Sequence, residues 1–205
     1  MMGWFGPSKD EVWRQLSREI GAEFVKGGFW KQNKVQVHVG PWTITLDTYT
    51  VRRQHHPHSH SHVTYTRIRA PYVNPEGFRF TIYRKGFFSD LGKLLGMQDI
   101  EVGDPEFDEA FIIKGNDENR VRDLFANAKI RQLILAQPKI RLTVKDSEGW
   151  FGPKFPENVD GLHFEVVGVI KDIDRLKSLF DLFAAVLNQL CRIGSARREE
   201  AGVEL

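Results

Sequence analysis

The chain has 205 residues, of which 41% are hydrophobic and 27% are charged, and its formal net charge is +2 at pH 7. This length fits one domain, and the composition is that of a globular protein with a core, which excludes a disordered chain. So small a net charge gives no electrostatic reason to expect a nucleic-acid partner. A single cysteine, Cys191, excludes an intramolecular disulfide framework.

The charge is unevenly distributed along the chain. Residues 1–97 contain 14 Lys and Arg against 7 Asp and Glu, whereas residues 98–118 contain 1 against 8. The carboxylates of this acidic stretch can bind Mg²⁺ or Ca²⁺, act as acid and base, or pair with the basic front half. They lack the spacing of an EF-hand loop, and we expect pairing within the fold or simple solvation.

The front half predicts one helix followed by strands. Ser8 and Glu11 form a capping box, and apolar residues then recur at three- and four-residue spacing, which predicts a helix over residues 9–25. Alternating apolar and polar residues predict four strands, the first two as a hairpin over residues 34–47. A short helix is expected over residues 87–95.

The central part of the chain predicts a turn, a strand and a helix with a break. The sequence Gly103-Asp104-Pro105 predicts the turn, and the strand is expected over residues 110–114. Asn116 or Asp117 caps the following helix. A shift in the apolar phase predicts a break near Asn127.

The end of the chain predicts two strands and a long amphipathic helix. The strands are expected over residues 139–145 and 162–166, and the helix begins at Asp172 or Asp174. Its buried stripe is expected to comprise Ile173, Leu176, Phe180, Phe183, Leu187 and Leu190.

These elements predict an α+β fold with a largely antiparallel sheet of about seven strands, an N-terminal helix, central helices and a long C-terminal helix. Most links between strands are too short for a parallel crossover. Four strands, three strands and a closing helix is also the element order of a pleckstrin-homology-like barrel. We expect residues 1–195 to form one domain and residues 196–205 to form a frayed charged tail.

The segment FDEAFIIKGNDENRVRDLFANAKIRQLI, residues 107–134, resembles an uncharacterised bacterial protein family. Its members carry an F-D-x-x-F-x-V-like strand, a short acidic cap and a helix. Phe107, Asp108 and Phe111 match this pattern, and Ile113 stands where the family usually has Val. Members often have membrane-spanning helices near their N-termini, whereas this chain has no apolar run of about 18 residues. The family has no assigned activity, so the resemblance implies no catalytic residue.

A histidine-rich motif, HHPHSHSH, occupies residues 55–62. In an extended chain His58, His60 and His62 face one side, about 6.6 Å apart, and imidazoles so placed bind Zn²⁺, Ni²⁺ or Cu²⁺. Our first hypothesis is a solvated loop between two strands that binds metal only adventitiously. The alternatives are a physiological metal site and a pH-sensitive loop.

A five-residue sequence, GWFGP, occurs at residues 3–7 and again at residues 149–153. Large aromatic residues in glycine turns commonly cover the edge of a hydrophobic core, which is our first hypothesis. The alternative is a pair of exposed wedges that contact a membrane surface or a protein partner. The residues concerned are Trp4, Phe5, Trp150 and Phe151.

Arginines and tyrosines on the predicted strands form a further candidate site. They can bind an anion or single-stranded nucleic acid, or pair with the acidic stretch. The residues are Arg67, Arg69, Arg79 and Arg84, with Tyr65, Tyr72 and Tyr83.

The chain contains no phosphate-binding loop, no dinucleotide glycine motif, no H-E-x-x-H and no G-x-S-x-G. The first hypothesis is therefore a non-enzymatic binding or scaffolding domain with no catalytic residue and no cofactor. The alternatives are a metal-dependent enzyme using the histidine-rich segment and a peripheral membrane or lipid-binding domain. With no signal peptide, we expect a cytoplasmic protein, peripheral to the membrane in the last case, with a protein or membrane partner rather than nucleic acid.

Overall fold

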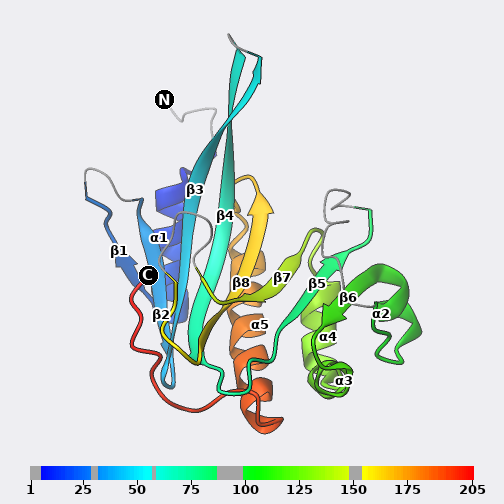
Figure 1. Ribbon diagram of the computed structural model, residues 1–205. Coiled ribbons are helices and arrows are strands. Elements are labelled where there is room, and N and C mark those ends of the chain that lie inside the picture. The colour runs from blue at the N-terminus through cyan, green and yellow to red at the C-terminus, as the bar shows by residue number, and fades with distance from the viewer. Residues whose placement is uncertain (1–5, 29–31, 57–58, 87–98, 148–153) are drawn as a thin grey trace, which may run out of the picture.

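The computed structural model describes residues 6–28, 32–56, 59–86, 99–147 and 154–205. There, eight strands form one antiparallel sheet in the order β1-β2-β3-β4-β8-β7-β5-β6 (Figure 1). The strands are β1 (Glu23–Val25), β2 (Lys34–Val39), β3 (Trp42–His56), β4 (Ser59–Val73), β5 (Phe80–Arg84), β6 (Phe111–Gly115), β7 (Arg141–Lys145) and β8 (Val159–Val167). The predicted α+β class and antiparallel sheet are confirmed.

The eighth strand, β1, comes from a segment that the sequence assigned to the first helix. The helix α1 (Lys9–Ile20) begins at the predicted capping box, where the Ser8 hydroxyl accepts a hydrogen bond from the Glu11 N–H. It ends at Gly21, whose φ of 67° is a left-handed conformation that glycine adopts without a steric penalty. The predicted end near residue 25 is therefore wrong, and β1 pairs with β2.

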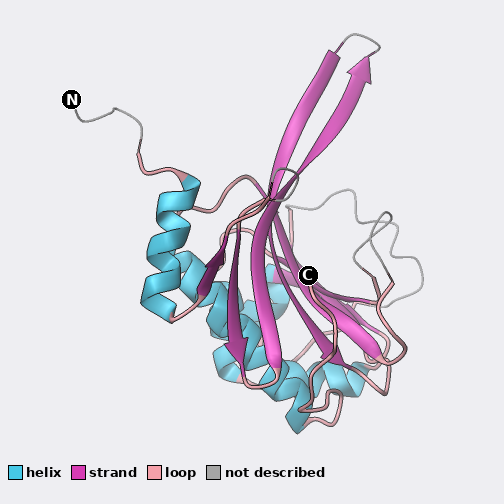
Figure 2. Cartoon of the chain, turned by 90° about the vertical axis from the view of Figure 1, so that its left-hand side faces the viewer, coloured by secondary structure: helices cyan, strands magenta, loops and turns pink. Residues whose placement is uncertain are grey.

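The helices α1 and α5 (Ile173–Arg192) lie on the same face of the sheet (Figures 1 and 2). The predicted stripe of α5 faces the core, and Leu176 and Phe183 have no exposed surface. Trp13 of α1 is also fully buried, and its Nε1 donates to the Ile170 carbonyl at 3.2 Å. The hydrophobic core thus lies between the sheet and this helix layer.

The central part of the chain contains three short helices. They are α2 (Pro105–Ala110), α3 (Glu118–Phe125) and α4 (Ala128–Leu135). The predicted turn at residues 103–105 instead begins α2, because the Asp104 carboxylate accepts from the Phe107 N–H and proline fits the first helical turn. Asp117 and Asn127 cap α3 and α4, which confirms the predicted helix start and break.

The strands β3 and β4 form a hairpin of two 15-residue strands that projects beyond the rest of the sheet (Figure 1). Its pairing extends to His56 opposite Ser59, so the predicted loop over residues 55–62 is corrected to strand on both sides of residues 57–58, which lie outside the described part. The β-branched and aromatic residues before it start the ladder, and further pairing satisfies the backbone groups of the histidines.

The sheet is open, with β1 and β6 as its edges within the described residues. A pleckstrin-homology-like barrel closes its strands into a ring, and its order of four strands, three strands and a helix differs from the five and three strands found here, so that analogy does not describe this sheet. The sheet does not close because β8 lies inside it, paired with β4 on one side and with β7 on the other. The last strand therefore joins the first four strands to the remaining three.

Residues 196–205, which we expected to be frayed, contact the sheet. The Arg197 N–H donates to the Val73 carbonyl at 3.1 Å, and the Arg198 guanidinium lies 5.7 Å from the ring centre of Trp42. Further along, Lys34 Nζ donates to the Leu205 carbonyl at 2.6 Å.

The short helix predicted over residues 87–95 lies outside the described residues. Among the helices that the structure does describe, none combines the length and the apolar character needed to cross a membrane.

Candidate functional site

Polar and charged side chains gather on the sheet face opposite the helices. They come from β3, β4, β7 and β8, because every second residue of a strand points away from the core. We call this surface the open face. Its central members are Asp47, Tyr49, Tyr65, Arg67, Arg69, Arg141, Thr143, Lys145, His163 and Glu165.

The strand register arranges these residues in rows across the sheet. Arg67 of β4 lies opposite Asp47 of β3 on one side and opposite Glu165 of β8 on the other. In the next row Arg69 lies opposite His163. The rows bring together side chains that are about a hundred residues apart in the sequence.

Asp47 binds both arginines. Its carboxylate accepts from Arg67 Nε and Nη2 at 2.6 and 2.9 Å and from Arg69 Nη2 at 2.7 Å. Asp47 and Arg69 are only 8% and 4% exposed. Burial lowers the pKa of Arg69 to about 10, against the opposing effect of the Asp47 charge. One carboxylate therefore binds two guanidinium groups.

Tyr49 connects an aromatic pair to the charged rows. Its hydroxyl donates to Glu165 Oε2 at 2.6 Å, and its ring stacks on Tyr65 with centroids 5.1 Å apart. The Arg67 guanidinium lies 4.9 Å from the Tyr49 ring centre. Burial, followed by the hydrogen bond to Glu165, raises the pKa of Tyr49. Tyr49 is therefore a protonated hydrogen-bond donor at neutral pH.

His163 is a buried histidine at the centre of the open face. It is 6% exposed, and its Nε2 has no hydrogen-bond partner among the described residues. Its ring packs beside Gly161, where an added Cβ would lie 2.8 Å from His163 Nε2 and from a ring carbon of Phe155. Burial, followed by the positive charges of Lys145 and Arg69, lowers the pKa of His163 to about 2. The imidazole is therefore neutral at physiological pH.

Arg141 and Lys145 extend the basic surface along β7. Neither side chain makes a hydrogen bond or an ion pair with another residue that the structure describes, and Arg141 Nε is buried. Burial lowers the pKa of Lys145, although the nearby charge of Glu165 acts in the other direction. Partly buried cations that form no ion pair are costly, and a bound anion would lower that cost.

Two hollows adjoin these residues. One has a volume of about 600 Å³ and the other about 270 Å³. The first is lined in part by Lys34, Tyr49, Arg67 and Arg69, and the second in part by Arg79, Arg141 and Lys145. The larger hollow is within the range of small-molecule sites.

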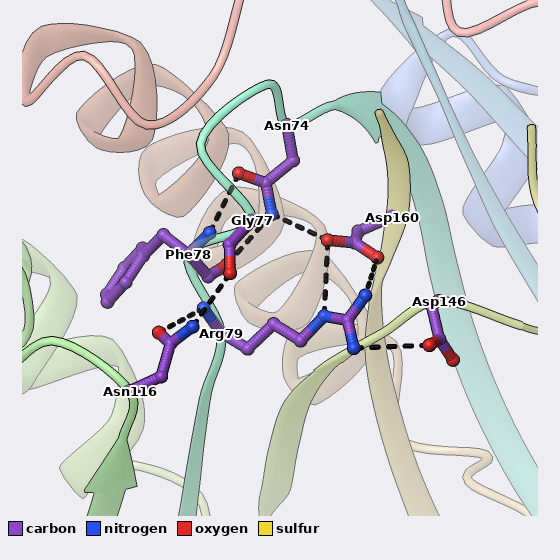
Figure 3. Close-up of polar contacts among 7 residues, drawn as sticks. All are labelled: Asn74, Gly77, Phe78, Arg79, Asn116, Asp146 and Asp160. Atoms are coloured by element: carbon purple, nitrogen blue, oxygen red, sulfur yellow. Dashed lines mark hydrogen bonds and ion pairs between the residues drawn. The ribbon is translucent and has the colours of Figure 1, made fainter. Parts of the chain in front are cut away.

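A second polar cluster, at the start of β5, is paired internally (Figure 3). Asp160 accepts from Asn74 Nδ2 at 2.6 Å and from Arg79 Nη2 at 3.1 Å, and Arg79 Nη1 donates to Asp146 at 3.1 Å. The Asn74 side-chain oxygen Oδ1 accepts from the Phe78 N–H and closes the turn. Although a cavity of about 450 Å³ adjoins this cluster, its charges satisfy one another. It therefore fastens the turn between β4 and β5 to β8.

The predicted metal site is not tested by the structure. Among the described residues no group of three or more His, Cys, Asp or Glu could hold a metal ion. His58 lies outside the described residues, the His60 side chain is not described, and His62 is exposed on β4.

The predicted aromatic wedges are equally untested. Trp4, Phe5, Trp150 and Phe151 all lie outside the described residues.

The arginines singled out from the sequence have separate roles. Arg67 and Arg69 lie on the open face with Tyr65, whereas Arg84 Nη2 donates to the carbonyls of Leu135 and Gln137. Tyr72 is buried in the core. Only part of the predicted group therefore belongs to one surface.

The acidic stretch pairs within its own part of the fold. Asp104 binds Arg131 at 2.8 Å, and Asp99 lies 3.5 Å from Lys114. The basic open face is therefore not neutralised by these two carboxylates.

Together these features define an α+β domain whose sheet has one face under helices and one open basic face. No protein-family model matches the chain, and no curated protein matches it. Among solved structures, the chain is similar to the crystal structure of the mycobacterial trehalose monomycolate transport factor A, TtfA. The identity is 9%, the TM-score is 0.48, and the match covers 88% of this chain and 95% of that chain.

Proposed function

We propose that the protein is a non-enzymatic binding module that takes an anionic ligand on the open face of its sheet. The observation that carries the proposal is the pair Arg141 and Lys145, two cations on β7 whose side chains form no ion pair with another described residue. An anion between them would supply charge-assisted hydrogen bonds, which are stronger than neutral ones.

The surroundings of this pair favour the same class of ligand. Arg67 and Arg69, which both bind Asp47, lie on the same face as this pair. The depressed pKa of His163 has neighbouring cations among its causes, and this too is a sign of positive potential. A small anion, or the anionic group of a larger molecule, is the complement of such a surface.

The same contacts support binding over catalysis. The two carboxylates at the centre of the face, Asp47 and Glu165, are already engaged by Arg67 and Tyr49 respectively. Groups held in this way contribute to the shape and charge of a site and are poorly placed to exchange protons with a substrate.

The resemblance to an uncharacterised bacterial family remains part of the proposal. Its motif residues have a packing role in this chain, because Phe107 and Phe111 are buried and their ring centroids are 4.8 Å apart. Such a motif supports a shared fold and leaves the ligand open.

The test is a calorimetric titration with inorganic phosphate at low ionic strength. We expect saturable binding that weakens as salt is added, because the interaction is electrostatic. Lys145→Gln and Arg141→Gln should each weaken binding about tenfold or more, since a hydrogen bond to a charged group contributes about 1.5–3 kcal/mol.

The matched control is Arg122→Gln. Arg122 lies on α3, its side chain is 54% exposed, and it pairs with Glu118 at 2.7 Å. The substitution therefore removes the same charge at a site away from the open face. Its phosphate affinity should equal that of the unaltered protein. Absence of phosphate binding, or equal losses in all three variants, would contradict the proposal.

A further inference from the structure

An exposed apolar patch adjoins the basic part of the open face. Val51 and Val167 are 39% and 64% exposed, and both belong to the short group of large hydrophobic residues exposed among the described ones. Val51 pairs with Val63, and Val167 pairs with Tyr65. The three valines and the stacked tyrosines therefore form a continuous surface at the base of the projecting hairpin.

The patch and the cations lie in consecutive rows of the same sheet. Val51 with Val63 forms the first row, and Tyr49 with Tyr65 forms the second. The third row holds Arg67 between Asp47 and Glu165. Two residues along a strand span roughly 6.6 Å, so the outer valines lie roughly 13 Å from the row of Arg67.

Polarity thus changes along the strands. The hairpin end of the open face is apolar, its middle is aromatic, and its far end carries Arg69, His163 and Lys145. Exposed valines that occur singly on a surface need no explanation. Here they are contiguous, and beyond the row in which Arg67 lies between Asp47 and Glu165 the same face carries Arg69 and Lys145. Such an arrangement complements a molecule with one apolar and one anionic end.

We propose that the ligand of the open face is an anionic amphiphile with a single hydrocarbon chain, whose charged group binds among the cations and whose chain lies over Tyr49, Tyr65 and the three valines. This inference rests on the proposed function, which supplies the anion site. The patch spans three strands, which lie about 4.8 Å apart, and this narrow strip suits one chain.

The test is a series of titrations of the whole protein with inorganic phosphate and with butyl, hexyl, octyl and decyl phosphate, each below its micelle concentration. Burial of one CH₂ contributes about fourfold in affinity when complete and less when one side stays wet. We expect the affinity to rise about two- to fourfold per CH₂ and to level off once the chain is longer than the patch.

Variants of the protein distinguish the contribution of the hydrocarbon chain to the affinity from that of the anionic group. The double substitution Val51→Thr with Val167→Thr keeps the β-branched shape while making the patch polar. We expect it to flatten the dependence on chain length and to leave the affinity for inorganic phosphate unchanged. The control is Thr64→Ala, which alters the opposite face of β4, where its hydroxyl lies 3.0 Å from that of Thr50. It should keep the full dependence on chain length.

The outcomes distinguish this inference from the proposed function. If inorganic phosphate binds and alkyl phosphates bind no more tightly, the inference that the ligand is an amphiphile is wrong, and the proposed anion site is retained. If the affinity rises equally with the length of the alkyl group in the valine variant and in the unaltered protein, the hydrocarbon chain binds elsewhere and the inference is overturned. If no anion binds, the proposed function fails, and this inference fails with it.

Discussion

At the scale of single residues, Asp47 is the most consequential side chain of the open face. It is one carboxylate between two guanidinium groups, and it is almost completely removed from solvent. A buried pair contributes little net stability compared with apolar packing, but loss of one partner leaves charge without compensation. The contact with Arg69, itself 4% exposed, makes that loss severe.

We therefore expect Asp47→Asn to lower the free energy of unfolding by about 3–5 kcal/mol, measured by denaturant titration. The matched control is Asp146→Asn, because Asp146 also binds an arginine, Arg79, but its side chain is 60% exposed. Exposed pairs contribute about 0–1 kcal/mol, so this variant should be close to the unaltered protein. Equal effects of the two substitutions would refute the importance of burial at Asp47.

The lowered pKa of His163 predicts that the stability of the protein falls as the pH falls below 6.5. Its pKa is lowered to about 2 in the folded protein, whereas histidine in an unfolded chain titrates near 6.5. Below pH 6.5 the unfolded state therefore binds more protons, so the contribution of His163 to stability is complete above pH 6.5 and decreases as the pH falls. The slope from one such group is at most about 1.4 kcal/mol per pH unit.

We expect His163→Gln to reduce the loss of stability between pH 6.5 and 4.5, measured by denaturant unfolding at several pH values. His38→Gln serves as the control, because His38 is exposed on β2. Parallel stability profiles for His163→Gln and the unaltered protein would show that protonation of His163 is not linked to unfolding.

At the scale of elements, α5 supplies a large part of the core. Phe183 has no exposed surface, and Asp181, two residues earlier, is exposed on the other side of the helix. We expect Phe183→Ala to cost about 3–5 kcal/mol of stability and to lower the melting temperature markedly. Asp181→Ala should change the melting temperature little. An unchanged melting temperature for Phe183→Ala would argue against the buried stripe.

The hairpin of β3 and β4 allows a test of the histidine-rich segment. We expect His58, His60 and His62 to bind a divalent metal in solution without the fold depending on it, because β3 and β4 pair along their length. A structural zinc site, by contrast, contributes much of the folding free energy of its domain. Thermal melts with and without a chelator should nearly coincide.

Metal analysis of protein purified without a nickel column completes this experiment. Stoichiometric zinc together with a large fall in melting temperature on chelation would favour the metal-dependent alternative over our proposal.

Local patterns in the sequence predicted most elements because the information is contained in a few neighbouring residues. The alternation around Leu142 and the stripe around Phe183 each locate an element without reference to the rest of the chain. The helix α2 and the strand β1 were missed for equally local reasons. The proline after Asp104 predicts a turn where α2 begins, and Gly21, which ends α1, lies inside the helix that the apolar spacing predicts.

The open face could be predicted only in part. Arg67, Arg69 and Tyr65 were recognisable as a polar strand face with a capacity for anions. Their grouping with Lys145 and His163 depends on β8 entering the sheet between β4 and β7, which no local pattern states. Strand order is decided by packing and loop closure across the whole chain, so that part of the site required the structure.

At the scale of the whole molecule, the position of β8 leads us to expect that the fold unfolds as one cooperative unit. Among the strands that the structure describes, β1 to β4 are joined to β5 to β7 only by the pairing of β8, which extends over nine residues with β4 and over four with β7. The helix α5 spans the same junction by packing against both α1 and α4. The core-facing side chains of both groups of strands belong to one hydrophobic cluster that includes residues of β8 and α5.

We therefore expect a single unfolding transition, with the same free energy of opening in both halves of the sheet. Native-state hydrogen exchange is the measurement, because it reports opening amide by amide. The amides of Ile68 in β4 and Ile82 in β5, both fully buried, should exchange through the same global event. If Ile82 exchanged at a free energy several kcal/mol lower than Ile68, the strands beyond β8 would form a separate unit, and the single domain that we predict for residues 1–195 would have to be divided at β8.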